Sequence, residues 1–329
     1  MNSRHYYWNG LAIAMLLLSL IACTPATTST TPLTPVTIQL SWTHSSQFAG
    51  YYAADQLGYY STEGLAVTFI EGGPTVDRLK AVLDGSAQFG IASGTNLIEA
   101  RAEGNQLVAI AAILRRDPFT FFTLAGSGIT SPQDFKGKVI QIRVRARPYL
   151  YPILARVGLT PEQITEANDA AFDDLYTGEV DVATGFITTQ LVDAQRAGYK
   201  LNVIYPDDYG VHSMSDMIFA TDTFLAQNHD LALRFLRATL KGWTYVVENP
   251  VQAAAFVAKY RPEADLAYET ATLTASLPYI NTGEDHIGWM KPDIWTDMEQ
   301  TSREQGVITK PVEVTQVYTL QFLQEIYEP

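Results

Sequence analysis

VTIQLSWTHSSQFAGYYAADQLG, residues 36–58, is the stretch that decides the fold class. Its first five residues, 36–40, combine β-branched and leucine side chains with polar ones, and this pattern predicts a strand. Ser45 and Ser46 follow and can cap a helix that ends at Gly58. A strand that leads into a capped helix is the first half of a β–α–β unit, from which parallel sheets are built.

The same alternation of apolar runs and helical periods continues along the chain. We expect strands at 66–71, 88–92, 107–114, 120–124, 139–144, 181–184, 201–205 and 217–220, and helices at 76–83, 149–157, 172–177, 222–248, 251–260, 267–277 and 314–327. The strands up to 124 are expected to form one sheet and those from 139 to 220 a second. This predicts an α/β protein with a discontinuous first lobe, residues 36–125 and 221–329, and an inserted second lobe, residues 126–220. Ligands in such folds bind outside the carboxyl ends of the strands, so the site is expected in a cleft between the lobes.

The N-terminus predicts export. Residues 1–22 carry Arg4 and an apolar core that is shorter than the roughly 20 residues of a membrane-spanning helix, as in a signal peptide. The core ends at LIAC, and Cys23 is the only cysteine in the chain. This ending resembles a bacterial lipobox, whose cysteine sulfur takes a lipid, and residues 23–35 are a Thr/Pro-rich tether. We therefore expect a lipid-anchored protein on the outer face of the cell membrane.

Composition and charge exclude several functional classes. The 329 residues include 47% hydrophobic side chains, which is typical of a folded protein. With 22 Lys and Arg against 35 Asp and Glu, the formal net charge is −13, which argues against nucleic acid as a partner. One cysteine allows no disulfide within the molecule. The sequence has no G-x-S-x-G, Walker A or H-E-x-x-H motif of a common enzyme class.

Four segments carry a family resemblance: LSWTHSSQFAGYYAA at 40–54, LGYYSTEGL at 57–65, GGP at 72–74 and FKGK at 135–138. They resemble the NMT1/THI5-like group of periplasmic solute-binding proteins, and the similarity runs over most of residues 36–260. The resemblance implies a type II periplasmic-binding-protein (Venus flytrap) fold, with two α/β lobes around a ligand cleft. It also implies an ABC permease with its ATPase as partner. We expect no cofactor. Members of the group bind pyrimidines, sulfonates, nitrate, riboflavin and other solutes, so the motifs do not identify the ligand.

The segment after the first strand supplies the first candidate ligand-binding residues, Trp42, His44, Gln47 and Tyr51. Trp42 can stack on a flat ring, and the alternative is a core Trp at the domain edge. His44 is expected to form hydrogen bonds, because no second metal-ligating residue lies at a suitable spacing. Gln47 and Tyr51 are one helical turn apart and share a face, although Tyr51 can equally belong to the core.

Polar residues at an expected helix start form a second group, Ser93, Thr95 and Asn96. Free backbone N–H groups at a helix N-terminus suit a carbonyl oxygen or an anion. As helix caps, these residues need no ligand.

In the second lobe, Arg143, Arg145, Arg147 and Tyr149 follow a strand. The family usually has a glycine-containing turn here, so this sequence departs from the pattern. Arg143 and Tyr149 are candidate ligand contacts, because an Arg in the cleft can grip carbonyl or phosphate oxygens in fork geometry. A solvated surface is the alternative for each Arg.

The segment 184–190 after the next strand favours one ligand over another. Family members that bind an aminopyrimidine are expected to have a carboxylate here, whereas this chain has Phe186 and Gln190. An amide matches an imide edge such as that of riboflavin. Tyr209, His212 and Asp216 are further candidates, and Asp216 suits ribityl hydroxyls but also an aminopyrimidine.

The sequence therefore predicts a binding protein for a vitamin-type aromatic heterocycle, with riboflavin first and a thiamine pyrimidine precursor second. An enzyme is a remote alternative, since the family includes a eukaryotic pyrimidine synthase that uses a cysteine-rich motif absent here. A sensory protein that presents its ligand to a membrane receptor is a further alternative.

Overall fold

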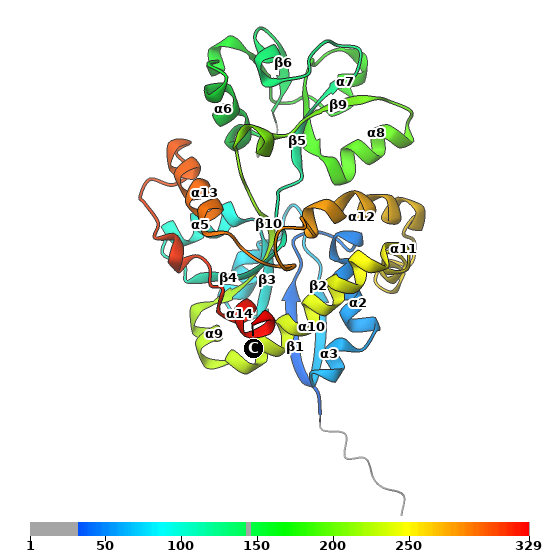
Figure 1. The fold of residues 1–329 in the computed structure, drawn as a ribbon, viewed down its shortest axis with the longest axis vertical. Coiled ribbons are helices and arrows are strands. Elements are labelled where there is room, and N and C mark those ends of the chain that lie inside the picture. The colour runs from blue at the N-terminus through cyan, green and yellow to red at the C-terminus, as the bar shows by residue number, and fades with distance from the viewer. Residues whose placement is uncertain (1–31, 143–145, 329) are drawn as a thin grey trace, which may run out of the picture. The chain divides into compact units, whose positions relative to one another are not determined.

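The largest sheet of the protein has five strands in the order β2-β1-β3-β10-β4 (Figure 1). The structure is a computed structural model and describes residues 32–142 and 146–328. The strands are β1 (Thr34–Gln39), β2 (Leu65–Ile70), β3 (Phe89–Ala92), β4 (Leu107–Leu114) and β10 (Ser215–Thr221). β1 pairs in parallel with β2 and β3, whereas β10 lies antiparallel between β3 and β4.

Helices cover both faces of this sheet because successive residues of a strand point to opposite sides. Phe89 stacks on Phe235 of α10 with ring centroids 4.1 Å apart. The next residue, Gly90, faces Val82 of α4. The helices that accompany the sheet are α2 (Ala49–Gln56), α3 (Tyr59–Thr62), α4 (Arg78–Leu83), α5 (Gly94–Ala102), α9 (Asp222–Gln227) and α10 (His229–Glu248).

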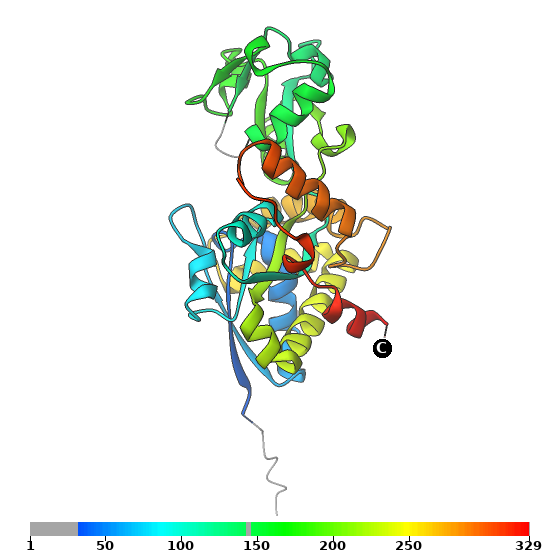
Figure 2. The same ribbon diagram turned by 90° about the vertical axis from the view of Figure 1, so that its left-hand side faces the viewer.

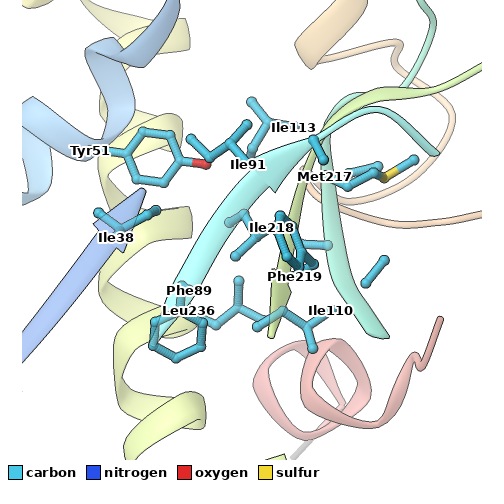
Figure 3. Packing of buried hydrophobic residues seen from close by; sticks show 14 of the residues in the cluster. Ile38, Tyr51, Phe89, Ile91, Ile110, Ile113, Met217, Ile218, Phe219 and Leu236 are labelled. Carbon is cyan, nitrogen blue, oxygen red and sulfur yellow. The ribbon is translucent and has the colours of Figure 1, made fainter. Parts of the chain in front are cut away.

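α2 and α10 pack unusually closely. Gly50 of α2 lies against the indole of Trp243, and a Cβ at Gly242 would lie 2.1 Å from the carbonyl oxygen of Gly50. The core that these helices cover is drawn in Figure 3, where Tyr51 lies among apolar side chains of the sheet.

Two smaller sheets lie between β4 and β10 in the sequence. One has the order β8-β5-β9 and the other pairs β6 with β7. Their strands are β5 (Phe119–Leu124), β6 (Val139–Gln141), β7 (Thr165–Ala167), β8 (Ala183–Phe186) and β9 (Leu201–Ile204), with helices α6 (Arg147–Arg156), α7 (Asp174–Thr177) and α8 (Val192–Arg196).

Two strands belong to other sheets than we expected. The strand predicted at 120–124 is β5, which pairs with β8 and β9, and the strand predicted at 217–220 is β10, which pairs with β3 and β4. β10 forms backbone hydrogen bonds with strands on both of its sides, β3 and β4, and β5 does the same between β8 and β9.

The buried side chains follow the same division. One core cluster draws on residues 36–114 and 214–323, and two others draw on residues 119–211. We call residues 33–114 and 214–328 the first region and residues 119–211 the second region. We propose that the chain crosses between them at 115–118 and 212–213, in place of the limits expected at 125 and 220.

The C-terminal helices return to the first region. They are α11 (Pro250–Ala255), α12 (Leu266–Ile280), α13 (Pro292–Glu304) and α14 (Gln321–Tyr327). α13, which we did not expect, packs against α5 (Figure 2). The single helix predicted at 314–327 is interrupted, because Thr319 donates its N–H to Ala109 on the edge strand β4.

In the parts of the chain that the structure describes, no helix is both long and apolar enough to cross a membrane. The predicted signal peptide and Cys23 lie outside the described residues.

Candidate ligand-binding site

A loop that follows β1, residues 41–48, forms the centre of the candidate site, and we call it the ligand loop. Gln39, at the end of β1, is buried and donates its amide N–H groups to the carbonyl oxygens of Ile70 (3.2 Å) and Glu71 (2.9 Å). Gly72 donates its N–H to the Trp42 carbonyl oxygen at 3.0 Å. A Cβ at Gly72 would lie 2.4 Å from the Leu40 carbonyl oxygen, so only glycine allows this approach.

Two predicted site residues meet directly. Nε2 of Gln47 donates to both carboxylate oxygens of Asp216, at 3.0 Å each, although the residues are 169 positions apart. The Asp216 side chain is 9% exposed, and its backbone φ is +50°, which is uncommon for a residue other than glycine. A buried carboxylate in a sparsely populated backbone conformation is typical of a functional site.

Tyr51 lies on α2, four residues after Gln47. Its side chain is 1% exposed, and its hydroxyl has no hydrogen-bond partner among the described residues. Burial raises the pKa of the Tyr51 hydroxyl well above its usual value, and the Asp216 carboxylate raises it further. Tyr51 therefore stays protonated, and its hydroxyl is a donor close to a carboxylate.

Trp42 lies on the ligand loop and is 47% exposed, so it is not a core tryptophan.

Ser93 caps α5 by accepting the Asn96 N–H at 3.2 Å. The Asn96 side-chain oxygen accepts from Ser93 Oγ at 2.9 Å and from Arg78 Nη2 at 3.0 Å. Arg78, at the first position of α4, also reaches the Ser41 carbonyl oxygen at 3.5 Å, so it connects the ligand loop to the start of α5. Thr95 is half-buried beside Asn96.

The second region contributes a cluster of aromatic rings. Tyr149 stacks on Phe119 with ring centroids 4.4 Å apart, and Phe186 meets Phe119 edge-on at 5.9 Å. The Tyr149 hydroxyl donates to Oδ2 of Asp117 at 2.9 Å. Phe186 is 36% exposed, so this cluster offers a ring surface to solvent.

Phe119, Asp117 and Arg78 were absent from the sequence-based candidates. The dipeptide Asp117-Pro118 at the end of an apolar run marks the point where the chain changes sheets. This dipeptide is the signal that could have identified Asp117 and Phe119.

Gln190, a predicted ligand contact, is hydrogen-bonded within its own segment. Its Oε1 accepts from the Phe186 N–H at 2.8 Å and from Thr189 Oγ1 at 2.7 Å, within the turn Ile187–Leu191. The amide oxygen is thus used locally, and a two-point contact with an imide would require this turn to open.

Three other predicted residues have contacts that do not involve Gln47 or Asp216. Tyr209 packs on the core of the second region, where burial raises the pKa of its hydroxyl and the Asp208 and Asp134 carboxylates raise it further. Nδ1 of His212 lies 2.7 Å from Oδ1 of Asp207. His212 lines a separate cavity of about 220 Å³ that also contains Arg116 and Glu284. His44 belongs to a ring cluster described next, and Arg143 and Arg145 lie outside the described residues.

His44 is part of the support of the ligand loop. Its Nδ1 lies 2.7 Å from the Tyr52 hydroxyl, and its ring is 5.3 Å from that of Tyr260. Its backbone N–H donates to Oε1 of Glu71 at 2.7 Å. Burial lowers the pKa of the His44 imidazole, Glu71 raises it, and Arg261 lowers it, with a net decrease.

The lowered pKa of His44 predicts a pH dependence of stability. Below about pH 6.5, His44 binds a proton in the unfolded chain. In the folded protein it stays neutral to a lower pH, because its pKa is lowered. The free energy of unfolding should therefore fall as pH drops from about 6.5 towards the folded-state pKa of His44. Thermal unfolding is measured at about pH 7.5 and about pH 5.5. Between these two pH values the melting temperature of His44→Gln should fall by less than that of the wild type. An equal decrease in both proteins would remove His44 as the cause.

Among residues 32–142 and 146–328, no three His, Cys, Asp or Glu side chains form a group that could hold a metal ion.

Comparison with known proteins identifies the family. Residues 45–253 match the family model described as NMT1/THI5 like. The riboflavin-binding protein RibY of Chloroflexus aurantiacus is 28% identical over 312 residues, which cover 91% of this chain and 89% of that protein. The formylaminopyrimidine-binding protein of Halalkalibacterium halodurans is 23% identical, covering 87% of this chain and 92% of its own length. A 4-amino-5-hydroxymethyl-2-methylpyrimidine phosphate synthase of Legionella pneumophila is 24% identical, covering 88% of this chain and 92% of its own length.

The fold is that of the periplasmic binding proteins, as expected. The aliphatic sulphonate-binding protein SsuA of Escherichia coli superposes with a TM-score of 0.67 at 16% identity, covering 87% of this chain and 91% of that one. With the family model spanning well over half of its length, the chain belongs to the NMT1/THI5-like family.

Proposed function

We propose that the protein is the solute-binding component of an ABC importer and that its ligand is riboflavin. The observation that carries the proposal is the Gln47–Asp216 pair, because it places a carboxylate acceptor against the loop that also carries the exposed ring of Trp42. The ring cluster of Phe119, Tyr149 and Phe186 supplies a second aromatic surface from the other region. We infer that the two surfaces close on opposite faces of a flat ligand.

Riboflavin suits these groups chemically. Its three fused rings suit stacking by Trp42 on one side and by the Phe119 cluster on the other. Its ribityl hydroxyls are donors that a carboxylate such as Asp216 accepts in charge-assisted hydrogen bonds. The RibY relative, whose name states riboflavin binding, supports this choice.

An anionic ligand fits less well, although a sulphonate-binding protein shares the fold. The Asp216 carboxylate is buried beside the ligand loop, and the whole chain has a formal charge of −13. A sulfonate would be repelled locally by the Asp216 carboxylate and at longer range by the net negative charge of the chain.

A formylaminopyrimidine-type ligand is the second candidate, and Asp216 is again the reason. An aminopyrimidine whose basic ring nitrogen is protonated presents two adjacent N–H donors, which a carboxylate accepts in a two-point contact. The binding protein of Halalkalibacterium halodurans supports this alternative. Synthase activity is less favoured, because the chain has one cysteine, at position 23, and cannot form a cysteine-rich motif.

We further propose that the protein is exported, attached to lipid through Cys23, and served by a membrane permease. The LIAC sequence and the tether at 23–35 support the attachment. Mass spectrometry of the mature N-terminus would detect the lipid, and an unmodified Cys23 would contradict it.

The decisive experiment is purification followed by ligand titration. Bound flavin would appear as yellow colour and fluorescence in the extracted protein. Thermal unfolding with riboflavin, formylaminopyrimidine and an alkanesulfonate then ranks the ligands, since a ligand at 100 times its Kd stabilises by about 2.7 kcal/mol. Stabilisation by riboflavin alone supports the proposal, whereas stabilisation by the pyrimidine alone or the sulfonate alone overturns the choice of riboflavin.

Trp42→Ala tests the stacking surface. Loss of the ring should weaken riboflavin binding about 2- to 12-fold, which corresponds to about 0.5–1.5 kcal/mol for an aromatic pair. The melting temperature of the free protein should change little, because Trp42 is 47% exposed. Trp42→Phe should retain most of the affinity, and Val251→Ala, which changes an exposed side chain on α11, is the control. Unchanged affinity in Trp42→Ala would remove Trp42 from the site.

A further inference from the structure

A buried carboxylate accepts a hydrogen bond from the backbone of the ligand loop. Glu269, on α12, is 1% exposed. Its Oε2 accepts the backbone N–H of Ser46 at 2.6 Å, and its Oε1 accepts from the guanidinium of Arg261. Burial of a charge is costly unless it is paired and hydrogen-bonded, so this carboxylate is tied to a specific geometry of its partners.

A second contact joins α12 to the same residue of the loop. The hydroxyl oxygens of Thr272 and Ser46 lie 2.8 Å apart. Ser46 precedes Gln47, whose amide holds Asp216. Two hydrogen bonds thus connect α12 to Ser46, the residue next to Gln47. A shift of α12 should therefore also move Gln47.

The N-terminal end of α12 contacts the second region (Figure 1). Arg196 of α8 donates to Oδ2 of Asp265, the N-cap residue of α12, at 2.8 Å. The same guanidinium lies over the ring of Tyr268 at 5.5 Å. α12 also lies beside the turn Ile187–Leu191, which carries Gln190.

We propose that Glu269 is a positioning residue for ligand binding and that α12 couples the ligand loop to the second region through Arg196. This inference rests on the proposed function, because it concerns the same site. When Arg196 holds the N-terminal end of α12, Glu269 and Thr272 hold Ser46 in place, and Gln47 keeps Asp216 oriented towards the ligand. Removal of either attachment loosens the ligand loop.

The first test needs no ligand. Hydrogen exchange of the free, full-length protein is measured for peptides covering residues 41–48 and, as an internal control, residues 107–114 of β4. Arg196→Ala should speed exchange in 41–48 about two- to fivefold, the range expected for a half-exposed ion pair, and leave β4 unchanged. The effect should shrink at about 1 M salt, which a purely steric role of Arg196 would not show. Unchanged exchange in 41–48 overturns the coupling, whether or not the protein binds riboflavin.

The second test measures riboflavin affinity in Glu269→Gln, Thr272→Val and Arg196→Ala, singly and combined. Glu269→Gln should weaken binding about tenfold, because the amide keeps an acceptor but loses the charge that pairs with Arg261. Glu263→Gln makes the same change at an exposed position and should have no effect. Because Thr272→Val removes one hydroxyl and keeps the shape of the side chain, it tests the Ser46 contact if Glu269→Gln folds poorly.

The double variant shows whether Arg196 and Thr272 act on the ligand loop through the same helix or independently of each other. If α12 transmits the effect, Arg196→Ala combined with Thr272→Val should weaken binding by less than the product of the single effects. A simple product, or variants that lower the melting temperature without changing affinity, would overturn the proposal. Absence of riboflavin binding in the wild type would count against the proposed ligand only, since the exchange experiment still decides the coupling.

Discussion

Asp216→Asn is expected to weaken riboflavin binding about 10- to 100-fold while the protein remains folded. The carboxylate accepts two contacts from Gln47 and lies beside the Tyr51 hydroxyl, whose pKa it raises. Hydrogen bonds to a charged group contribute about 1.5–3 kcal/mol, which corresponds to this range of affinity. Asparagine tolerates the φ of +50° at this position, so the backbone need not change.

The controls for this prediction separate charge from conformation. Asp297→Asn, at an exposed position on α13, makes the same chemical change away from the site and should leave affinity unaltered. Asp216→Ala should weaken binding at least as much and should also lower stability, because alanine adopts a positive φ less readily. Isothermal titration gives the affinities, and near-wild-type binding by Asp216→Asn would exclude the carboxylate as a ligand contact.

Gly242→Ala is expected to destabilise the fold by about 3 kcal/mol or more, at the upper end of the range for overpacked cores. The added Cβ would lie 2.1 Å from the Gly50 carbonyl oxygen, which is backbone and cannot rotate away. α2 and α10 would have to separate. The melting temperature should fall by about 5–10 °C.

The same substitution should also impair binding, because α2 carries Tyr51 and follows the ligand loop. Gly126→Ala is the matched control, since nothing lies within 4 Å of its added Cβ. Thermal unfolding of the two variants should therefore differ clearly. Equal melting temperatures would show that the helices accommodate a methyl group and that their close approach is not required.

Local sequence patterns singled out some of the residues that the structure brings together and missed others, and their role as ligand contacts stays a prediction. Gln47 and Asp216 were both expected at the site, and the structure joins them. α13 was missed, although Trp295, Met298, Glu299 and Ser302 have helical spacing and are all buried. Pro292 at its start was a further signal.

Residues that act through distant partners left no local signal. In the sequence, Glu269 looks like an ordinary polar residue of a helix. In the structure it is buried and accepts the backbone N–H of Ser46, 223 positions away. Arg196 reads as a surface cation until α12 places Asp265 and Tyr268 beside it. Arg78 also left no local signal, because its partners Ser41 and Asn96 lie 37 and 18 positions away.

The amino-acid sequence by itself determined the class of the fold and the family, because strand and helix periods, caps and glycine turns depend on neighbouring residues. Tertiary structure alone decided which sheet β5 and β10 join, that Gln190 folds back on its own turn, and that α12 connects the ligand loop to the second region. These features depend on burial and on contacts between residues far apart in the chain, and such energies are not encoded in any short segment.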